Sequence, residues 1–174
     1  MFLPVFLCGM PGSGKSTLGR KLAASLKLQF IDLDREIELH TGLSPDLIIN
    51  QRGDDVFRKI EGATLEKLCE SRNVLIACGG GTPCFGNNLT LMESSGLCVL
   101  IEVPLAAIKQ RLLSNKGFEK RPLLSQNAEH LEQSLLQLFE GRTDCYNKIE
   151  KVLRPLQESK PEMLEKLKNW MILA

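Results

Sequence analysis

The chain has 174 residues, of which 43% are hydrophobic and 25% are charged, and its formal net charge at pH 7 is +1. This length fits one globular domain, and the composition excludes an intrinsically disordered chain. The near-neutral charge lacks the basic excess of a general nucleic-acid binder, and no apolar run is long enough to span a membrane. We therefore expect neither nucleic acid nor a membrane as a partner.

The cysteines are not arranged as metal ligands, because none of them forms a C-x-x-C pair. Most lie in apolar runs, as expected of buried free thiols in a reducing compartment. The apolar residues 1–8 lead directly into a glycine-rich motif, so we interpret them as a strand rather than as a signal peptide. These observations together predict a cytoplasmic protein.

Strands and helices are predicted to alternate along the first half of the chain. Leu18, Leu22 and Leu26 form one helical stripe, and Ser44 followed by Pro45 is typical of a helix start. We expect strands over residues 3–8, 29–33 and 73–78, and helices over residues 17–26 and 54–70.

The second half continues the alternation. We expect strands over residues 97–103 and 151–153, and helices over residues 104–113, 128–146 and 161–173. Between them, residues 114–126 are rich in polar residues and predict a mobile surface loop. Alternating strands and helices indicate one α/β domain over residues 1–174, with a parallel sheet covered by helices on both faces. Ligands of such sheets bind beyond the carboxyl ends of the strands.

Residues 9–16 read G-M-P-G-S-G-K-S and match the phosphate-loop pattern at every fixed position. The glycines allow backbone N–H groups to surround phosphate oxygens, and the following helix adds a favourable dipole. Lys15 is expected to reach the β- and γ-phosphates, and the Ser16 hydroxyl to hold Mg²⁺. The predicted nucleotide-binding residues of this loop are Gly12, Ser13, Gly14, Lys15, Ser16 and Thr17.

A phosphate loop alone does not distinguish a small-molecule kinase from a GTPase or a larger NTP-driven machine. No aspartate in the chain has glycine three residues later, so the D-x-x-G motif of GTPases is absent. Asn147 and Lys148 imitate the guanine-reading N-K-x-D motif, but Glu150 replaces its aspartate. Motor and transporter ATPases usually need a longer chain, which leaves the small-molecule kinases.

Asp32 and Asp34 follow the second predicted strand. Residues i and i+2 of a strand point the same way, so both carboxylates are expected to face the phosphate loop. Asp32 is suited to contact Mg²⁺ through water, and Asp34 to accept a proton or a hydrogen bond from an acceptor hydroxyl. The alternative for Asp34 is an N-cap of the helical run that follows, and one residue can serve both roles.

Six motifs of the chain occur together in the order and with the spacing found in one family. They are residues 9–16, D-x-D at 32–34, Phe57-Arg58 with Glu61, G-G-G at 79–81, R-P-L-L at 121–124, and Arg142 with Tyr146. In this ordered set the chain resembles the shikimate kinase family over roughly residues 3–173. The resemblance implies a three-layer P-loop kinase fold with strand order 2-3-1-4-5. It also implies a monomer that transfers the γ-phosphoryl group of ATP to the 3-hydroxyl of shikimate.

The resemblance assigns the acceptor site to residues 34–61 and to the glycine motif. It implies that Arg58 and Arg142 clamp the shikimate carboxylate, since a guanidinium binds a carboxylate in a bidentate fork. Glu61 lies one helical turn after Arg58 and would orient its guanidinium. Phe57 belongs to the same acceptor-binding motif. The backbone N–H groups of Gly79, Gly80 and Gly81 would bind a substrate hydroxyl, which approaches closely because glycine has no Cβ.

The resemblance further implies a lid over residues 114–126, whose closure would bring Arg121 onto the transferring phosphate and exclude water. Arg111, on the helix before the lid, is a candidate to stack on adenine, but residues 154–161 do not identify the opposite wall. One departure is Asp54, where the family usually has Glu; we expect a water or a shifted helix to fill the gap of one methylene.

Two rival functions stay open at this point. Another small-molecule kinase of the same fold, such as a gluconate or nucleoside-monophosphate kinase, shares the phosphate loop. A non-catalytic NTP-binding module is the rival from a different class. The D-x-D pair and the two arginines argue against a nucleotide acceptor, and the complete transfer apparatus of Lys15, Ser16, Asp34 and Arg121 argues against a pure binding module.

Overall fold

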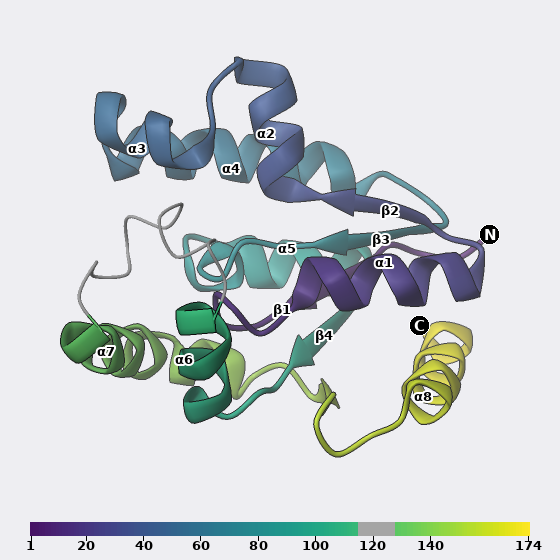
Figure 1. Cartoon of the computed structure of the whole chain (residues 1–174). Helices are drawn as coiled ribbons and strands as arrows, with labels where there is room; N and C mark the ends of the chain where they lie inside the picture. Colours follow the sequence, from purple (N-terminus) through teal and green to yellow (C-terminus); the bar gives the residue numbers. More distant parts are fainter. Residues whose placement is uncertain (115–127) are drawn as a thin grey trace.

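The computed structural model describes residues 1–114 and 128–174, and within these ranges the chain forms a five-stranded parallel sheet of order β2-β3-β1-β4-β5 (Figure 1). The strands are β1 (Val5–Cys8), β2 (Gln29–Asp32), β3 (Val74–Ala77), β4 (Leu97–Ile101) and β5 (Lys151–Leu153). This order is the one that the family resemblance implies.

Helices connect the strands. The first half contains α1 (Lys15–Leu26), α2 (Leu33–Thr41), α3 (Pro45–Arg52) and α4 (Asp54–Cys69). After β3 follow the 3₁₀ helix η1 (Thr82–Cys84), α5 (Asn88–Ser95), α6 (Leu105–Ser114), α7 (Ala128–Tyr146) and α8 (Lys160–Leu173). The sequence pattern missed η1 and α5. None of the described helices is long and apolar enough to cross a membrane.

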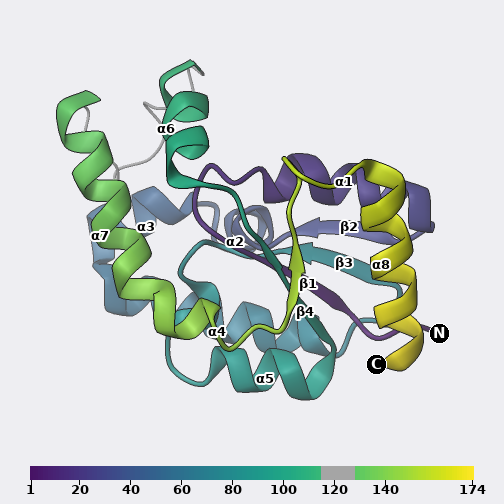
Figure 2. The ribbon, with the colours of Figure 1, turned by 90° about the horizontal axis from the view of Figure 1, so that it is seen from below.

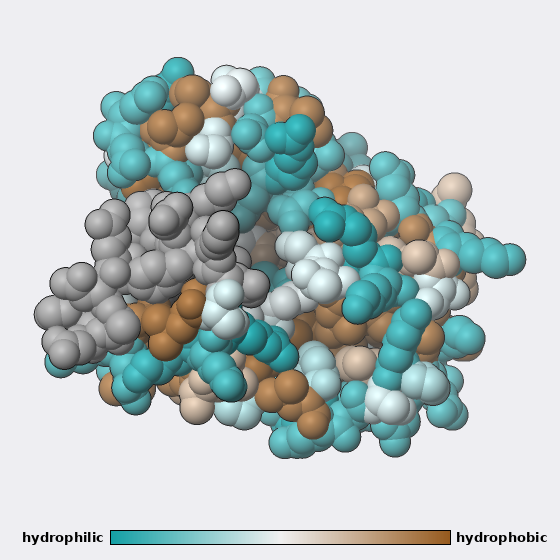
Figure 3. Space-filling model, in the orientation of Figure 1, coloured by the Kyte–Doolittle hydropathy of each residue, from teal (hydrophilic) through white to brown (hydrophobic). Residues whose placement is uncertain are grey.

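The domain has three layers. Figure 2 shows α1 and α8 on one side of the sheet, and α4 and α5 on the other. Every residue of β1, β3 and β4 is buried, which explains why these strands are unbroken apolar runs in the sequence. Hydrophilic residues cover much of the face seen in Figure 3, with apolar residues in small patches between them.

The start of α3 follows the sequence signal. The Ser44 hydroxyl accepts a hydrogen bond of 3.4 Å from the backbone N–H of Leu47, and Pro45 is the first helical residue. The second strand, in contrast, is one residue shorter than predicted. Leu33 already begins α2, because Leu33 and Ile37, one helical turn apart, are both fully buried.

Candidate active site

A cleft of about 1000 Å³ opens at the carboxyl ends of the strands. The loop between β1 and α1 forms its centre, and α2 to α4 lie on one side of it with α6 on the other. This is the position at which open parallel sheets bind their ligands.

The phosphate loop has the geometry of an anion site. Gly12 and Gly14 adopt φ values of 83° and 92°, a left-handed conformation that glycine adopts readily. The Lys15 ammonium is held over the loop by hydrogen bonds of 2.8 Å and 3.0 Å to the carbonyls of Gly9 and Met10. The buried Ser13 hydroxyl has no hydrogen-bond partner among the described residues. Positive charge, a helix N-terminus and an unsatisfied polar atom all fit a phosphate.

Ser16 and Asp32 meet where α1 begins and β2 ends. The Ser16 hydroxyl donates a hydrogen bond of 2.6 Å to the Asp32 carboxylate. A hydroxyl and a carboxylate are hard oxygen donors, so this pair fits Mg²⁺. The described residues contain no group of three His, Cys, Asp or Glu side chains placed for a metal. Mg²⁺ commonly takes its remaining ligands from water and substrate phosphates, so these two residues suffice.

Asp34 reaches the cleft in a different way from the one predicted. It lies in the first turn of α2 rather than on a strand, so strand alternation is the wrong reason for its direction. The N-cap interpretation is also wrong, because Asp32 occupies the N-cap position and makes no side-chain capping bond. Both carboxylates nevertheless line the cleft.

The Asp34 carboxylate is open to solvent in the cleft, yet protein atoms around it displace much of its water. This desolvation, together with the neighbouring Asp32 and Glu61, raises the pKa of Asp34 to about 6. The Lys15 ammonium acts in the opposite direction. The carboxylate is thus ionised at pH 7 with a basicity suited to accepting a proton.

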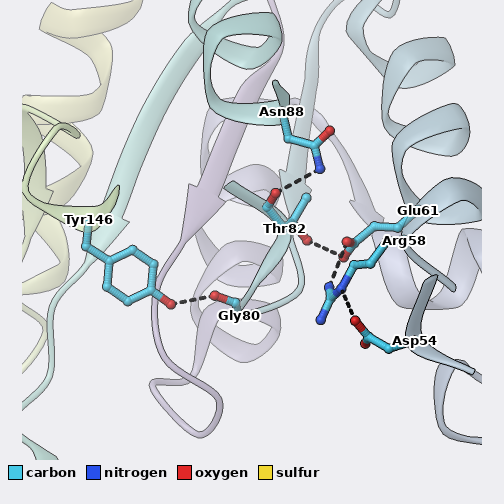
Figure 4. Close-up of polar contacts among 7 residues, drawn as sticks. All are labelled: Asp54, Arg58, Glu61, Gly80, Thr82, Asn88 and Tyr146. Carbon is cyan, nitrogen blue, oxygen red and sulfur yellow. Dashed lines mark hydrogen bonds and ion pairs between the residues drawn. The ribbon is translucent and has the colours of Figure 1, made fainter. Parts of the chain in front are cut away.

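The guanidinium of Arg58 is fixed by two carboxylates of its own helix (Figure 4). Its Nη1 donates to Glu61 Oε2 at 2.9 Å, and its Nε donates to Asp54 Oδ2 at 3.4 Å. Asp54 therefore contacts Arg58 directly, so the pair needs no water between its side chains. An i, i+4 spacing brings the two side chains close enough despite the shorter aspartate.

Glu61 also holds the glycine motif. Its second oxygen, Oε1, accepts a hydrogen bond of 2.7 Å from the Thr82 hydroxyl (Figure 4). The Asn88 amide donates to the Thr82 carbonyl at 2.8 Å. Glu61 is only 1% exposed, so both of its oxygens are satisfied inside the protein. The segment after Gly81 is thereby tied to the helix that carries Arg58.

The glycine motif is required for space rather than for unusual backbone angles. None of the three glycines has a positive φ. A Cβ on Gly80 would lie 2.7 Å from the Pro11 ring and 2.9 Å from Nη1 of Arg142. The sequence predicted glycine here because a ligand comes close to the backbone. The structure adds a second reason, which is that the protein's own side chains also come close to it. On the far side, the Tyr146 hydroxyl donates to the Gly80 carbonyl at 2.6 Å (Figure 4).

Arg142 places a second guanidinium beside the motif. The residue is 7% exposed, and its Nη1 has no hydrogen-bond partner among the described residues. A buried cationic N–H group without a partner at the wall of a cleft is chemically suited to an anionic ligand.

Comparison with known proteins decides the family. The family model described as shikimate kinase matches residues 11–171. The chain belongs to the shikimate kinase family. Two curated shikimate kinases illustrate the similarity. That of Parabacteroides distasonis is 38% identical over 145 residues, 83% of each chain, and that of Aquifex aeolicus is 35% identical over 168 residues, 95% of this chain and 96% of the other.

Solved shikimate kinase structures show the same fold. The Bacteroides thetaiotaomicron enzyme has a TM-score of 0.86 at 30% identity, covering 99% of this chain and 98% of the other. The Acinetobacter baumannii enzyme in complex with shikimate also has a TM-score of 0.86, at 29% identity, covering 99% of this chain and 94% of the other. The protein is accordingly an ATP-dependent, Mg²⁺-using kinase that phosphorylates the 3-hydroxyl of shikimate.

The structure brings the predicted site residues of the shikimate kinase together. All those in the described ranges line the one cleft: Gly12, Ser13, Gly14, Lys15, Ser16, Thr17, Asp32, Asp34, Phe57, Arg58, Gly79, Gly80, Gly81, Arg111 and Arg142. Arg121 and almost all of the predicted lid lie outside the described residues, and Ser114 ends α6.

Sequence reasoning missed several residues that line the cleft. Pro155 lines it together with the predicted Arg111, whose guanidinium donates to the Ser13 carbonyl at 3.0 Å. Pro155 is therefore a candidate for the adenine-facing wall that residues 154–161 did not reveal. Pro45 and Ile49 of α3 line the acceptor side. Their only sequence signal is a helix start, which does not indicate a binding role.

Proposed function

We propose that Arg58 and Arg142 hold the carboxylate of shikimate from two sides of the glycine motif. The observation that carries the proposal is their placement at neighbouring glycines. Nη1 of Arg142 lies 2.9 Å from a Cβ built on Gly80, and Nη1 of Arg58 lies 3.3 Å from one built on Gly81. Two guanidinium groups this close to one loop repel each other, and a bound carboxylate offsets that repulsion.

The phosphate loop binds the triphosphate in this proposal. Backbone N–H groups of residues 12–17 and the Lys15 ammonium hold the β- and γ-phosphates. Ser16 and Asp32 are positioned to hold Mg²⁺, which would neutralise negative charge on the phosphates. Arg111 and Pro155 enclose the adenine.

Asp34 is proposed to bind the reacting hydroxyl of shikimate. Its position in the first turn of α2, beside Gly79, supports this, since a Cβ on Gly79 would lie 3.4 Å from Asp34 Oδ1. The carboxylate accepts a hydrogen bond from the hydroxyl and aligns its oxygen with the γ-phosphorus. Phosphoryl transfer proceeds through a loose transition state, in which a strong base is not required. Orienting the hydroxyl therefore accelerates the reaction even if its proton leaves only after the transition state.

We propose that residues 34–61 bind the acceptor and that residues 114–126 act as a lid. Acceptor binding by residues 34–61 is supported by the cleft-lining side chains of Asp34, Ile49, Phe57 and Arg58. The lid, with Arg121 on the transferring phosphate, is supported by the R-P-L-L motif. A closed lid excludes water and thereby limits ATP hydrolysis.

We further propose a monomeric, cytoplasmic enzyme that acts on neither nucleic acid nor membrane. Support for the reducing compartment comes from the cysteines, all of which are free, four of them buried. Size-exclusion chromatography with light scattering tests the monomer, for which the expected mass is 19.4 kDa.

The experiment that tests this function is ADP release with MgATP and shikimate, gluconate, AMP or no acceptor. We expect turnover with shikimate alone. Turnover with another acceptor would overturn the roles of Arg58 and Arg142 while keeping the phosphate loop. ATP binding without turnover on any acceptor would favour the binding module.

A further inference from the structure

The guanidinium of Arg58 lies over the ring of Phe85. The Cζ atom of Arg58 is 3.7 Å from the centroid of the Phe85 ring, and 4.9 Å from that of Phe57. Phe85 follows η1 and is 39% exposed, so the ring does not belong to the buried core. No part of the proposed mechanism uses it.

The contact restrains a movement of the guanidinium that the two carboxylates leave open. Asp54 and Glu61 bind N–H groups at the edge of the guanidinium, and such in-plane bonds resist movement within the plane. A ring stacked on the face resists tilting out of the plane, and it attracts the cation through its π electrons. With Phe85 in place, Arg58 presents its remaining edge in a fixed direction.

The backbone beside Phe85 is built to allow this contact. A Cβ on Gly81 would lie 3.0 Å from a ring carbon of Phe85 and 3.3 Å from Nη1 of Arg58. A side chain at residue 81 would therefore separate the ring from the guanidinium. The last glycine of the motif thus makes room for the stacked pair.

We propose that Phe85 is a positioning residue for carboxylate recognition, which holds the plane of the Arg58 guanidinium in the orientation that the acceptor's carboxylate needs. This inference rests on the proposed function of Arg58. Phe85 acts through Arg58 and does not touch the reacting atoms. Its removal weakens binding of the charged acceptor and leaves ATP binding unchanged.

The test compares Phe85→Leu with Phe85→Tyr, which keeps the ring, and with Phe139→Leu, a matched control. Phe139 is also 39% exposed and lies on α7. We expect Phe85→Leu to raise the KM of shikimate about fivefold, as a partly desolvated cation–π contact does, with the KM of ATP unchanged. Phe85→Tyr and Phe139→Leu should behave as the wild type.

A second acceptor separates positioning from a merely structural role. In shikimate whose carboxylate is replaced by a carboxamide, the charge that Arg58 recognises is absent. We expect the wild type and Phe85→Leu to use this analogue with equal KM. An equal KM increase on both acceptors, or no increase on shikimate, overturns the inference.

Arg58→Ala, measured on the same two acceptors, tests the underlying clamp. The proposed role of Arg58 requires that Arg58→Ala prefer the carboxylate over the carboxamide less strongly than the wild type does; an unchanged preference contradicts that role. If Arg58→Ala loses the preference but Phe85→Leu keeps it, the role of Arg58 stands and only that of Phe85 fails.

Discussion

The hydroxyl of Thr82 donates a 2.7 Å hydrogen bond to the carboxylate of Glu61, although the two residues lie on different helices, 21 residues apart in the sequence. Glu61 lies on α4 and Thr82 begins η1, directly after the glycine motif. Because the other oxygen of Glu61 binds Arg58, one buried carboxylate sets the distance between the arginine and the backbone N–H groups of the glycine motif.

We expect Thr82→Val to weaken both stability and acceptor binding, since it leaves one oxygen of a buried carboxylate without its donor. An unsatisfied buried polar group costs about 1–3 kcal/mol, measurable by urea unfolding. The KM of shikimate should rise while that of ATP stays unchanged. Thr64→Val is the control, because the Thr64 hydroxyl only donates to the Ile60 carbonyl within the same helix. Equal effects of both variants would contradict the link.

Arg58→Ala should raise the KM of shikimate by roughly 30-fold or more, because loss of a desolvated charged contact costs about 2 kcal/mol or more. ATP affinity, measured by titration calorimetry, should remain nearly intact. Arg72→Ala serves as the control, since Arg72 is exposed and binds only nearby backbone carbonyls. An equal loss of ATP affinity would argue against the carboxylate clamp.

Asp34→Asn should mainly lower kcat. In the wild type, kcat/KM should rise with pH through about 6 and then level off, because the carboxylate form predominates above the pKa of Asp34. The asparagine variant should lack this ascending limb. Steady-state kinetics from pH 5 to 8 measure both effects, and an unchanged kcat would remove Asp34 from the mechanism.

The same substitution should stabilise the ligand-free fold at neutral pH. The pKa of Asp34 is raised in the folded state, so ionisation there costs free energy that the unfolded chain does not bear. This cost is absent below about pH 4, grows as pH rises, and is complete above about pH 6. We expect a gain of about 1 kcal/mol at pH 7.5, reduced by solvent screening in the open cleft. Urea unfolding at pH 4 should show no difference.

Gly80→Ala should disrupt the site, because the added Cβ would lie 2.7 Å from the Pro11 ring and 2.9 Å from Arg142. Overpacking of this kind typically costs about 1–3 kcal/mol. Gly141→Ala is the matched control on α7, where a Cβ meets nothing within 4 Å. Alanine is a better helix former than glycine, so this control should be neutral or stabilising. Thermal unfolding and shikimate KM distinguish the two.

Most of the sheet could be predicted because its strands are apolar runs that the fold buries completely. The run Val5–Cys8 predicted β1, and the phosphate loop predicted a helix after it, although α1 begins at Lys15, two residues earlier than the pattern indicated. The end of β2 could not be placed, because Leu33 is apolar in either state and only its packing beside Ile37 selects the helix. The helix Asn88–Ser95 has no clear amphipathic stripe and gave no signal.

The site residues could be listed from motifs, but their contacts could not. The pairing of Arg58 with Glu61 follows from helical spacing, whereas the bond from Thr82 to Glu61 spans 21 residues of sequence. Phe85 carries no motif at all, and Pro155 enters the cleft only because β5 lies at the edge of the sheet beside β4.

The position of β1 in the middle of the sheet separates the two halves of the cleft, with Arg111 and Pro155 on one side of the phosphate loop and Arg58 on the other. A single cleft of about 1000 Å³ connects the two halves, so one inhibitor molecule is able to occupy both of them. A compound that joins an adenine-like group to a carboxylate through an anionic linker would engage both halves at once. Its selectivity against other nucleotide-binding proteins would come from the arginine side, which nucleotide recognition alone does not require.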